Sequence, residues 1–262
     1  MIVLGFDTAT RSTAVALRLA EGRTLQARDD PPPGEHPGHA TRLLAMAHGL
    51  LVDAGVPWRA LDRIAVGLGP GTFTGLRVGI ATARGLAQSL PAELVGVSSL
   101  RALAEGALAG DQRPAEGEPD RVGAPDAVLA LIDARRGEVF AAAYERGEDA
   151  SSPAELLPAR ALAPEQLGAL YAAAEEKAAP ATRRWLALGD GATRFRDDLR
   201  DLAVEVPADS SPLHLVSAGA ICRLGACATP AAGYEQILPD YRRRPDAELA
   251  LEAAVAGGAS RG

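Results

Sequence analysis

A glycine-rich stretch at residues 65–90, AVGLGPGTFTGLRVGIATARGLAQSL, has the residue types that hold phosphate groups in many enzymes. Glycines let a ligand approach the backbone, and the N–H groups at the start of a helix attract anions. A Walker-type loop requires Gly, four residues, Gly, and then Lys with Ser or Thr. Here five residues separate Gly69 from Gly75, and Leu76 and Arg77 follow. The stretch is therefore not a Walker loop.

The same turn also departs from the dinucleotide-binding fingerprint. That fingerprint is Gly-x-Gly-x-x-Gly. Gly69 and Gly71 match its first two glycines, but Thr74 stands at the position of the third. Two interpretations stay open: the backbone N–H groups hold an anion, or Thr72 or Thr74 caps the helix that follows. We favour the cap.

The predicted helix after the turn carries a small residue at every fourth position, at Gly75, Gly79, Ala83 and Ala87. Residues with this spacing share one helix face, and small side chains let a neighbouring element come close. One interpretation is that this strip packs on the chain's own sheet. The other is that it contacts a helix of another subunit.

An aspartate at the end of the first apolar segment is a further candidate. Asp7, with Thr8 and Thr10 after it, could face a phosphate or a metal ion, or could close a turn through its side chain. The sequence alone leaves these alternatives open.

Other groupings give weak signals for chemistry. His36 and His39 are three residues apart in a Pro-Gly loop, and no second cluster of metal ligands follows, so we predict no metal site. Cys222 and Cys227 fit neither a disulfide framework nor a common zinc pattern. Asp190 lies between two glycines, which is typical of a turn.

Nucleophilic catalysis has no clear candidate either. The serine pairs at 98–99 and 210–211 have no nearby histidine arranged as a base, although sequence alone leaves a triad open. Lys177 is the single lysine, so a phosphate-binding or Schiff-base lysine has no other candidate. We predict no catalytic residues.

Composition narrows the functions further. The chain has 262 residues, of which 47% are apolar, and a formal net charge of −7. It can bury a large core in one domain or two lobes. The negative charge argues against a free-standing nucleic-acid binder, because such binding depends on cations that meet phosphates. The start lacks a basic region and no apolar run reaches about 18 residues, so we expect neither a signal peptide nor a membrane span. The two cysteines, which fit no disulfide framework, predict a reducing cytoplasm.

Apolar patterning predicts an α/β first half. Its segments are a strand at 1–7, a hairpin that turns at Glu21-Gly22, a helix at 39–55, a strand at 61–69, the helix after the glycine turn, and a strand and a helix at 92–108 with Ser98 or Ser99 as its cap.

A Gly/Pro-rich linker at 109–126 precedes a second half. Its segments are a hairpin at 127–147 that turns at 135–137, a strand, turn and helix at 183–202, a helix at 211–228, and an extended tail from 234 that ends in a short helix. Both halves open with an apolar strand that ends in aspartate, Asp7 and Asp133, which hints at a duplicated fold.

Five motifs, which follow one another in a fixed order, resemble the bacterial TsaB family. They are GFDTATRSTAVAL, GLGPGTFTGLRVGIATARGLA, VGVSSLRALA, LIDARRGEVFAAAY and LPDYRRRPDAE. The resemblance implies an α/β, two-lobed fold of the actin, sugar-kinase and heat-shock ATPase (ASKHA) type, a duplicated mixed sheet with flanking helices. We expect an N-terminal lobe at 1–105 with interface helices and a C-terminal lobe at 106–262, whose tail packs back on the first lobe.

The resemblance also implies a function in making threonylcarbamoyladenosine next to the anticodon of tRNA. The implied role is that of a non-catalytic scaffold that binds the paralogous transferase TsaD together with the ATPase TsaE. It implies a homodimer when TsaD is absent, and contact with tRNA only through the complex. The alternatives are an active ASKHA-type phosphotransferase, a glycoprotease-like peptidase, or a homodimeric scaffold unrelated to tRNA.

Two departures from ATP-binding relatives support the loss of catalysis. The first phosphate hairpin should contain Asp-x-Gly-Thr, and here positions 7–10 read Asp-Thr-Ala-Thr. Asp7, Thr8 and Thr10 thus mark a degenerate phosphate loop. The second hairpin has two arginines after Asp133 where glycines are expected. We expect no cofactor bound by this chain alone, with ATP or ADP only at the partner interface. Isolated protein should hydrolyse little ATP, and a strong rate abolished by Asp7→Ala would contradict this.

The glycine turn and its helix are then interpreted as an assembly surface, flanked by the helix at 40–54. The predicted interface residues are Thr72, Thr74, Gly75, Arg77, Gly79, Ala83 and Ala87. Gly79→Leu should abolish association and leave the circular dichroism nearly unchanged, whereas loss of the fold would mean that the strip is core. The run Arg242, Arg243 and Arg244 has no assigned role, and a solvated tail is the usual outcome for such runs.

Overall fold

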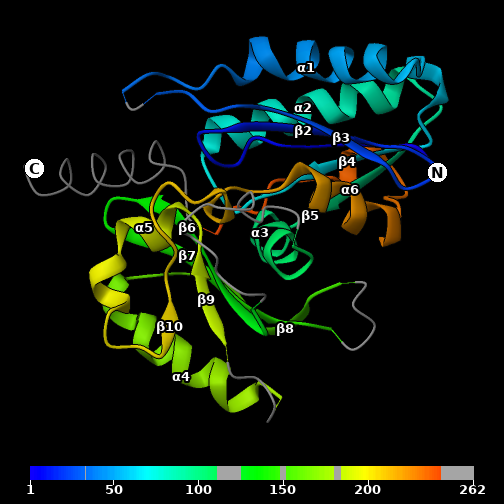
Figure 1. The fold of residues 1–262 in the computed structure, drawn as a ribbon. Coiled ribbons are helices and arrows are strands. Elements are labelled where there is room, and N and C mark those ends of the chain that lie inside the picture. Colours follow the sequence, from blue (N-terminus) through cyan, green and yellow to red (C-terminus); the bar gives the residue numbers. More distant parts are fainter. Residues whose placement is uncertain (33, 111–124, 148–151, 180–183, 243–262) are drawn as a thin grey trace, which may run out of the picture.

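Two five-stranded mixed sheets form the frame of the chain (Figure 1). The computed structural model describes all residues except 33, 111–124, 148–151, 180–183 and 243–262. Most of the predicted linker, the short helix expected in the tail, and Arg243 and Arg244 lie outside the described residues.

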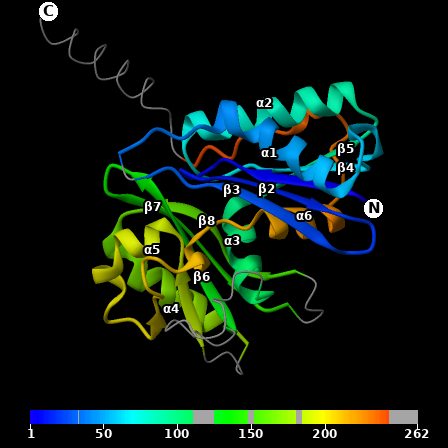
Figure 2. The same cartoon turned by 45° about the horizontal axis from the view of Figure 1, so that its top comes forward.

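The first sheet has the strand order β3-β2-β1-β4-β5. Its strands are β1 (Val3–Asp7), β2 (Thr13–Arg18), β3 (Thr24–Asp29), β4 (Arg63–Gly67) and β5 (Glu93–Val97). β1, β2 and β3 are antiparallel neighbours, whereas β1, β4 and β5 run parallel. Helices α1 (His39–Ala54) and α2 (Phe73–Ser89) lie side by side on one face of this sheet (Figures 1 and 2).

The second sheet repeats this order as β8-β7-β6-β9-β10. Its strands are β6 (Ala127–Arg135), β7 (Glu138–Glu145), β8 (Ala154–Leu162), β9 (Trp185–Leu188) and β10 (Val204–Glu205), and its helices are α4 (Leu167–Lys177) and α5 (Asp190–Arg194). In both sheets the first strand is central, with the hairpin on one side and parallel strands on the other. The predicted duplicated α/β fold of the ASKHA type is confirmed.

Two helices fill the space beneath the first sheet. α3 (Ser99–Leu108) packs on β6, β7 and α6, and α6 (Ala218–Cys227) packs on β1, β2 and β4. One apolar cluster joins residues of both sheets with these helices. α6 therefore follows the second sheet in sequence but covers the first in space, and the expected division at residue 105 stays a prediction.

Local sequence signals account for the ends of several elements. α1 ends at Gly55, whose φ of 66° suits the left-handed region, and the side chain of Ser98 caps α3. The hairpins that turn at 21–22 and 135–137 are also present. No sequence signal predicts β8, α4 or β10. β8 contains Pro158, and its pairing with β7 shifts register. Short 3-10 turns lie at Trp58–Ala60, Pro164–Gln166, Arg196–Leu199, Pro212–His214 and Tyr234–Gln236.

Among the described residues no helix is both long and apolar enough to cross a lipid bilayer.

Candidate functional site

The turn between β1 and β2 packs directly on the glycine block that begins α2. The hydroxyl of Thr8 donates to the Gly75 carbonyl at 2.7 Å, and the Thr72 N–H donates to the Ala9 carbonyl at 2.7 Å. A Cβ at Gly71 would overlap the Ala9 carbonyl, and one at Gly75 would overlap the Thr8 carbonyl. These glycines therefore admit the chain's own backbone, where a phosphate loop would admit a ligand.

The start of α2 tests the prediction that Thr72 or Thr74 caps this helix. Thr72 occupies the N-cap position with extended backbone, but its side chain makes no capping hydrogen bond. Thr74 lies inside the first turn and is exposed. Thr72 is thus the predicted N-cap residue by position, but the predicted side-chain hydrogen bond is absent.

Asp7 closes this turn through its side chain. Its Oδ1 accepts the Ala9 N–H at 2.8 Å, and its Oδ2 accepts the hydroxyl of Ser99. The Ser99 Oγ also accepts the Gly69 N–H at 3.2 Å, which ties the glycine block to the start of α3. Burial raises the pKa of Asp7, and the hydrogen bond from Ser99 opposes that rise. Of the alternatives left open for Asp7, turn closure is the one observed.

Thr10 and His39, which lie near this turn, each have a hydrogen-bond partner in the chain. Thr10 Oγ1 accepts the Ser12 N–H at a long 3.4 Å. His39 is buried, its Nδ1 lies 2.8 Å from the hydroxyl of Thr13, and burial lowers its pKa, while His36 is exposed. The two histidines thus point to different surroundings, and the described residues contain no group of three side chains suited to a metal ion.

The equivalent turn of the second sheet is built around a buried carboxylate. Asp133 Oδ2 pairs with Nη1 of Arg194 at 2.7 Å and with Nη1 of Arg135 at 3.1 Å. The Asp133 N–H donates to Asp190 Oδ1 at 2.9 Å, and burial raises the pKa of Asp190 to about 6. Asp190 is more than the predicted turn residue, since it opens α5 and ties that helix to β6.

The backbone of this second turn is unusual for its residue types. Arg135 has φ of 66°, Arg136 has φ of 52°, and Gly137 has φ of 81°. Left-handed conformations in succession close the hairpin tightly. This turn connects β6 to β7. It lies at the same end of the molecule as the β1–β2 turn (Figures 1 and 2).

Neither turn presents the bare backbone N–H groups with which a phosphate hairpin holds a nucleotide. In the first, carbonyls of Thr8 and Ala9 face the glycine block. In the second, the side chains of Arg135 and Arg194 pair with Asp133. A phosphate hairpin requires bare backbone N–H groups that point at the ligand.

The small-residue strip of α2 faces the chain's own sheet. Gly75, Gly79 and Ala83 are buried, and a Cβ at Gly79 would overlap the hydroxyl of Thr8. For these three residues the interface prediction is wrong, because the close neighbour that they admit is the β1–β2 turn and β4. Thr72, Thr74, Arg77 and Ala87 are exposed or half-buried, and their place in an interface stays a prediction.

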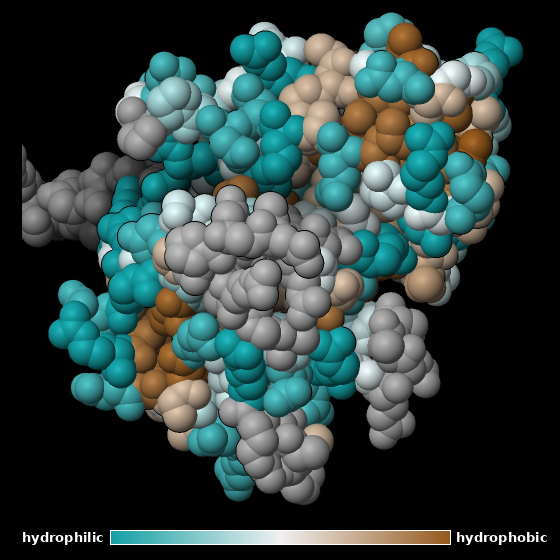
Figure 3. Space-filling view, in the orientation of Figure 1, coloured by the Kyte–Doolittle hydropathy of each residue, from teal (hydrophilic) through white to brown (hydrophobic). Residues whose placement is uncertain are grey.

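The outer face of α1 and α2 carries a different set of small and apolar residues. Leu44 is 47% exposed and Val52 is 62% exposed on α1. Ala45, Gly49, Ala81 and Gly85 are also exposed, and the two glycines have open space around them. Figure 3 shows apolar side chains gathered at the upper right, near the carboxyl-terminal end of α1.

The segment after α6 returns across α2 and holds it. Arg84 on α2 donates to the Ile237 carbonyl through Nε at 3.1 Å and Nη2 at 2.6 Å, and to the Glu235 carbonyl at 3.1 Å. The Asp240 N–H donates to the Leu68 carbonyl at 2.8 Å. We call residues 231–242 the clasp. The side chain of Ile237 is buried in the core of the first sheet.

An aromatic cluster lies where the clasp meets the start of α2. The rings of Phe73 and Tyr241 are 5.3 Å apart, and the guanidinium of Arg77 lies 3.7 Å from the centre of the Phe73 ring. Arg77 Nε also donates to the Tyr241 hydroxyl at 3.1 Å. Arg242 has a structural role after all, since it pairs with Asp240 and donates to a carbonyl of β8 at 3.1 Å.

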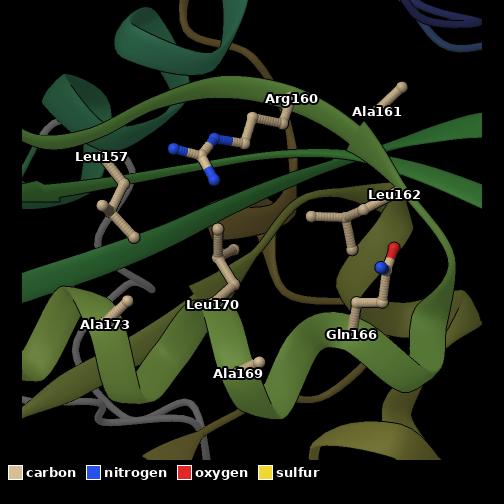
Figure 4. Close-up of a pocket in the computed structure, with 8 residues that line it drawn as sticks. All are labelled: Leu157, Arg160, Ala161, Leu162, Gln166, Ala169, Leu170 and Ala173. Carbon is tan, nitrogen blue, oxygen red and sulfur yellow. The ribbon is translucent and has the colours of Figure 1, made fainter.

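A cavity of about 300 Å³ lies apart from these turns, between β8 and α4 (Figure 4). It is mostly apolar, and Arg160 and Gln166 are the polar residues that line it; the others are Leu157, Ala161, Leu162, Ala169, Leu170 and Ala173. It contains none of the residues that the sequence singled out.

Comparison with known proteins identifies the family. The model of the family "TsaD: tRNA N6-adenosine threonylcarbamoyltransferase" matches residues 32–230. The solved structure of YeaZ from Pseudomonas aeruginosa is 30% identical with a TM-score of 0.71, and the match covers 92% of this chain and 99% of that one. The tRNA threonylcarbamoyladenosine biosynthesis protein TsaB of Escherichia coli is 38% identical over 149 residues. The chain belongs to the TsaB family.

The alignments with the curated TsaB proteins cover a smaller share of those proteins than the structural match covers of YeaZ. It spans 57% of this chain and of the E. coli protein, and 64% of this chain and of the Haemophilus influenzae TsaB, which is 31% identical. Family membership and fold are thus shown, and the activity and partners of a TsaB protein come to this chain as a proposal.

Sequence reasoning missed two parts of this TsaB-family site. Ser99 was expected only as a cap or a weak nucleophile, yet it holds both Asp7 and the glycine block. The sequence predicts only an extended tail for the clasp and assigns no contact to its Tyr241. That contact joins residues more than 160 positions apart, so no local pattern reveals it.

Proposed function

We propose that this chain serves the biosynthesis of threonylcarbamoyladenosine in tRNA as a non-catalytic subunit. Its relatives from E. coli and H. influenzae carry that biosynthesis in their names, and the matching family model is that of the transferase. In this proposal the chain binds a TsaD transferase, joined by the ATPase TsaE, and reaches tRNA as part of the complex.

One observation carries the non-catalytic role: the chain itself fills both turns where an ATP-binding relative would hold phosphates. At the first turn, the Thr8 and Ala9 carbonyls fill the space beside the glycines of the block that begins α2. Paired arginine and aspartate side chains occupy the second. We therefore propose that the isolated chain binds no nucleotide productively, and that ATP or ADP belongs to the complex with the partners.

The outer face of α1 and α2 is the surface that we assign to TsaD, or to a second copy when TsaD is absent. Exposed Leu44 and Val52 provide apolar area, and Ala81 and Gly85 let a helix approach closely. The predicted Thr74 and Arg77 lie on the same exposed side of α2.

A peptidase or phosphotransferase is less well supported by the described geometry. Ser211 and His214 are close in sequence, but both ring nitrogens of His214 face backbone groups, the Gly189 N–H at 3.2 Å and the Pro207 carbonyl at 3.3 Å. Ser99 donates to buried Asp7, which closes a turn. No observation favours either activity enough to propose it.

Size-exclusion chromatography with light scattering, with and without ATP, tests assembly with the TsaD protein of the same organism. We expect a one-to-one complex that replaces a self-dimer. Ala81→Trp should weaken that complex at least about tenfold, because a large side chain on a closely packed helix face keeps the partner away. The matched control is Ala172→Trp, on an exposed position of α4.

Two results would contradict the proposal. A chain that ignores TsaD would remove the partner, and Ala81→Trp behaving like the control would move the interface elsewhere. ATP hydrolysis by the isolated chain is the second readout. A strong rate that Asp7→Asn abolishes, with the fold intact by circular dichroism, would make the chain an enzyme.

A further inference from the structure

The β6–β7 turn keeps arginines in a backbone conformation that other residues adopt at lower cost. Arg135 and Arg136 both have positive φ. Glycine and asparagine are the residues usually found at such hairpin positions, since a larger side chain there crowds the backbone. Strained residues of this kind cluster at active sites, ligand clamps and switch regions.

The first of these arginines forms a preorganised pair with an arginine of α5. Arg135 and Arg194 each use Nη1 to bind the same oxygen of Asp133. Their side chains remain 50% and 43% exposed. Within the described part of the chain, no hydrogen bond occupies the Nε and Nη2 groups of either guanidinium. The shared carboxylate thus fixes both side chains and leaves N–H donors toward solvent.

Asp133 is itself held rigidly, so the pair has little freedom to lose on binding. Its Oδ1 accepts the Arg135 N–H at 2.8 Å, and its N–H donates to Asp190 at 2.9 Å. Two planar guanidinium groups with fixed donors match the oxygens of a phosphate group better than flexible ammonium groups do.

We propose that Arg135 and Arg194 bind a phosphate group of an RNA backbone. This inference rests on the proposed function, in which the complex acts on tRNA. A backbone phosphate fits better than a free nucleotide, because the pair sits half-exposed at a hairpin tip, whereas a nucleotide site buries most of its ligand. The net charge of −7 disfavours tight RNA binding by the chain alone, so in this inference the contact helps to position tRNA within the complex.

The test uses the complex with TsaD and the double variant Arg135→Asn, Arg194→Gln. Asparagine tolerates positive φ at position 135. Both changes remove a cation from buried Asp133, so the melting temperature should fall, and circular dichroism checks that the variant keeps its fold. Arg59→Gln, an exposed arginine in the turn after α1, is the control. Fluorescence anisotropy with labelled tRNA at several salt concentrations gives the affinity, and calorimetry with ATP and ADP gives the nucleotide affinity.

We expect the double variant to form the complex, to bind tRNA about tenfold more weakly, and to lower the slope of log K against log salt by about 1. Its ATP and ADP affinities should match the control. Unchanged tRNA binding with the wild-type slope would overturn the inference, as would loss of ATP or ADP affinity alone, which would assign the pair to a nucleotide. If the wild-type chain forms no complex at all, the proposed function fails first.

Discussion

Gly71 and Gly75 of the GPGTFTG block are required because backbone atoms of the β1–β2 turn lie where a side chain would be. Their positions suggest a ligand when the sequence is considered alone, since phosphate loops use the same residues. In the folded chain the Thr8 and Ala9 carbonyls take that space. A glycine that admits a ligand and a glycine that admits the protein's own backbone have the same sequence signature, so only the long-range contact separates them.

Gly79→Leu should destabilise the fold, in place of the selective loss of association that the sequence predicts. A leucine there meets the Thr8 hydroxyl and Val66 in a packed layer, and overpacking of this kind costs about 1–3 kcal/mol or more. Gly85→Leu is the matched control on the same helix, since nothing lies within 4 Å of Gly85. Urea unfolding measures both, and a Gly79→Leu variant as stable as wild type would show that this face is open.

Asp190 makes stability depend on pH in a defined direction. Its pKa is raised from 3.8 to about 6, chiefly by burial, so the folded protein holds this proton more tightly than the unfolded chain. Its contribution is fully present below about pH 4 and is lost as the pH rises through about 6.

Asp190→Asn should remove that dependence and still accept the Asp133 N–H. The gain in unfolding free energy over wild type should grow from pH 4 to pH 7, by at most about 3 kcal/mol. Denaturant titrations across this range, with exposed Asp201→Asn as the control, measure the difference. A gain that is the same at both pH values would show that Asp190 does not titrate in this range.

Among the elements, the clasp is held to α2 by the side chains of Arg84, Arg77 and Phe73. Arg84 makes three hydrogen bonds to clasp carbonyls, while the aromatic contact of Tyr241 lies at the exposed end. The clasp has little regular structure of its own, apart from the turn Tyr234–Gln236. Its order therefore comes from what it touches.

Arg84→Ala should loosen the clasp and leave the sheets intact. The Asp240 amide, which donates to Leu68, should exchange with deuterium about tenfold faster, since local opening becomes easier when these bonds are removed. Gln88→Ala, on an exposed position of the same helix, should leave the exchange unchanged. Equal exchange in wild type and Arg84→Ala would mean that the other contacts of the clasp hold it without Arg84.

Elements with strong local signals could be predicted from the sequence, and those without could not. α1 had an apolar period and a terminal glycine, and the two hairpins had clear turns. β8 lacked such a signal, because Pro158 and exposed residues alternate with its buried ones. α6 was expected as a helix, but its place under the first sheet depends on contacts with Gly5, which lies more than two hundred residues earlier.

At the scale of the whole molecule, the repeated strand order is the clearest trace of duplication. The aspartates at the ends of β1 and β6 hinted at it, and the same topology surrounds both. The chemistry around them could not be predicted: Asp7 meets Ser99 from 92 positions away, and Asp133 meets Arg194 from 61. Pairs so distant leave no local pattern.

The position of α6 also bears on how the protein is made. A ribosome completes β1 to β5 and α3 early, but the helix that covers the lower face of the first sheet is finished about 120 residues after α3. At about 5–20 residues per second, that interval is roughly 6–24 s. During it Val3, Ala16 and Ala65 lack their final cover. The nascent first half is thus a natural client for chaperones until the second half has emerged.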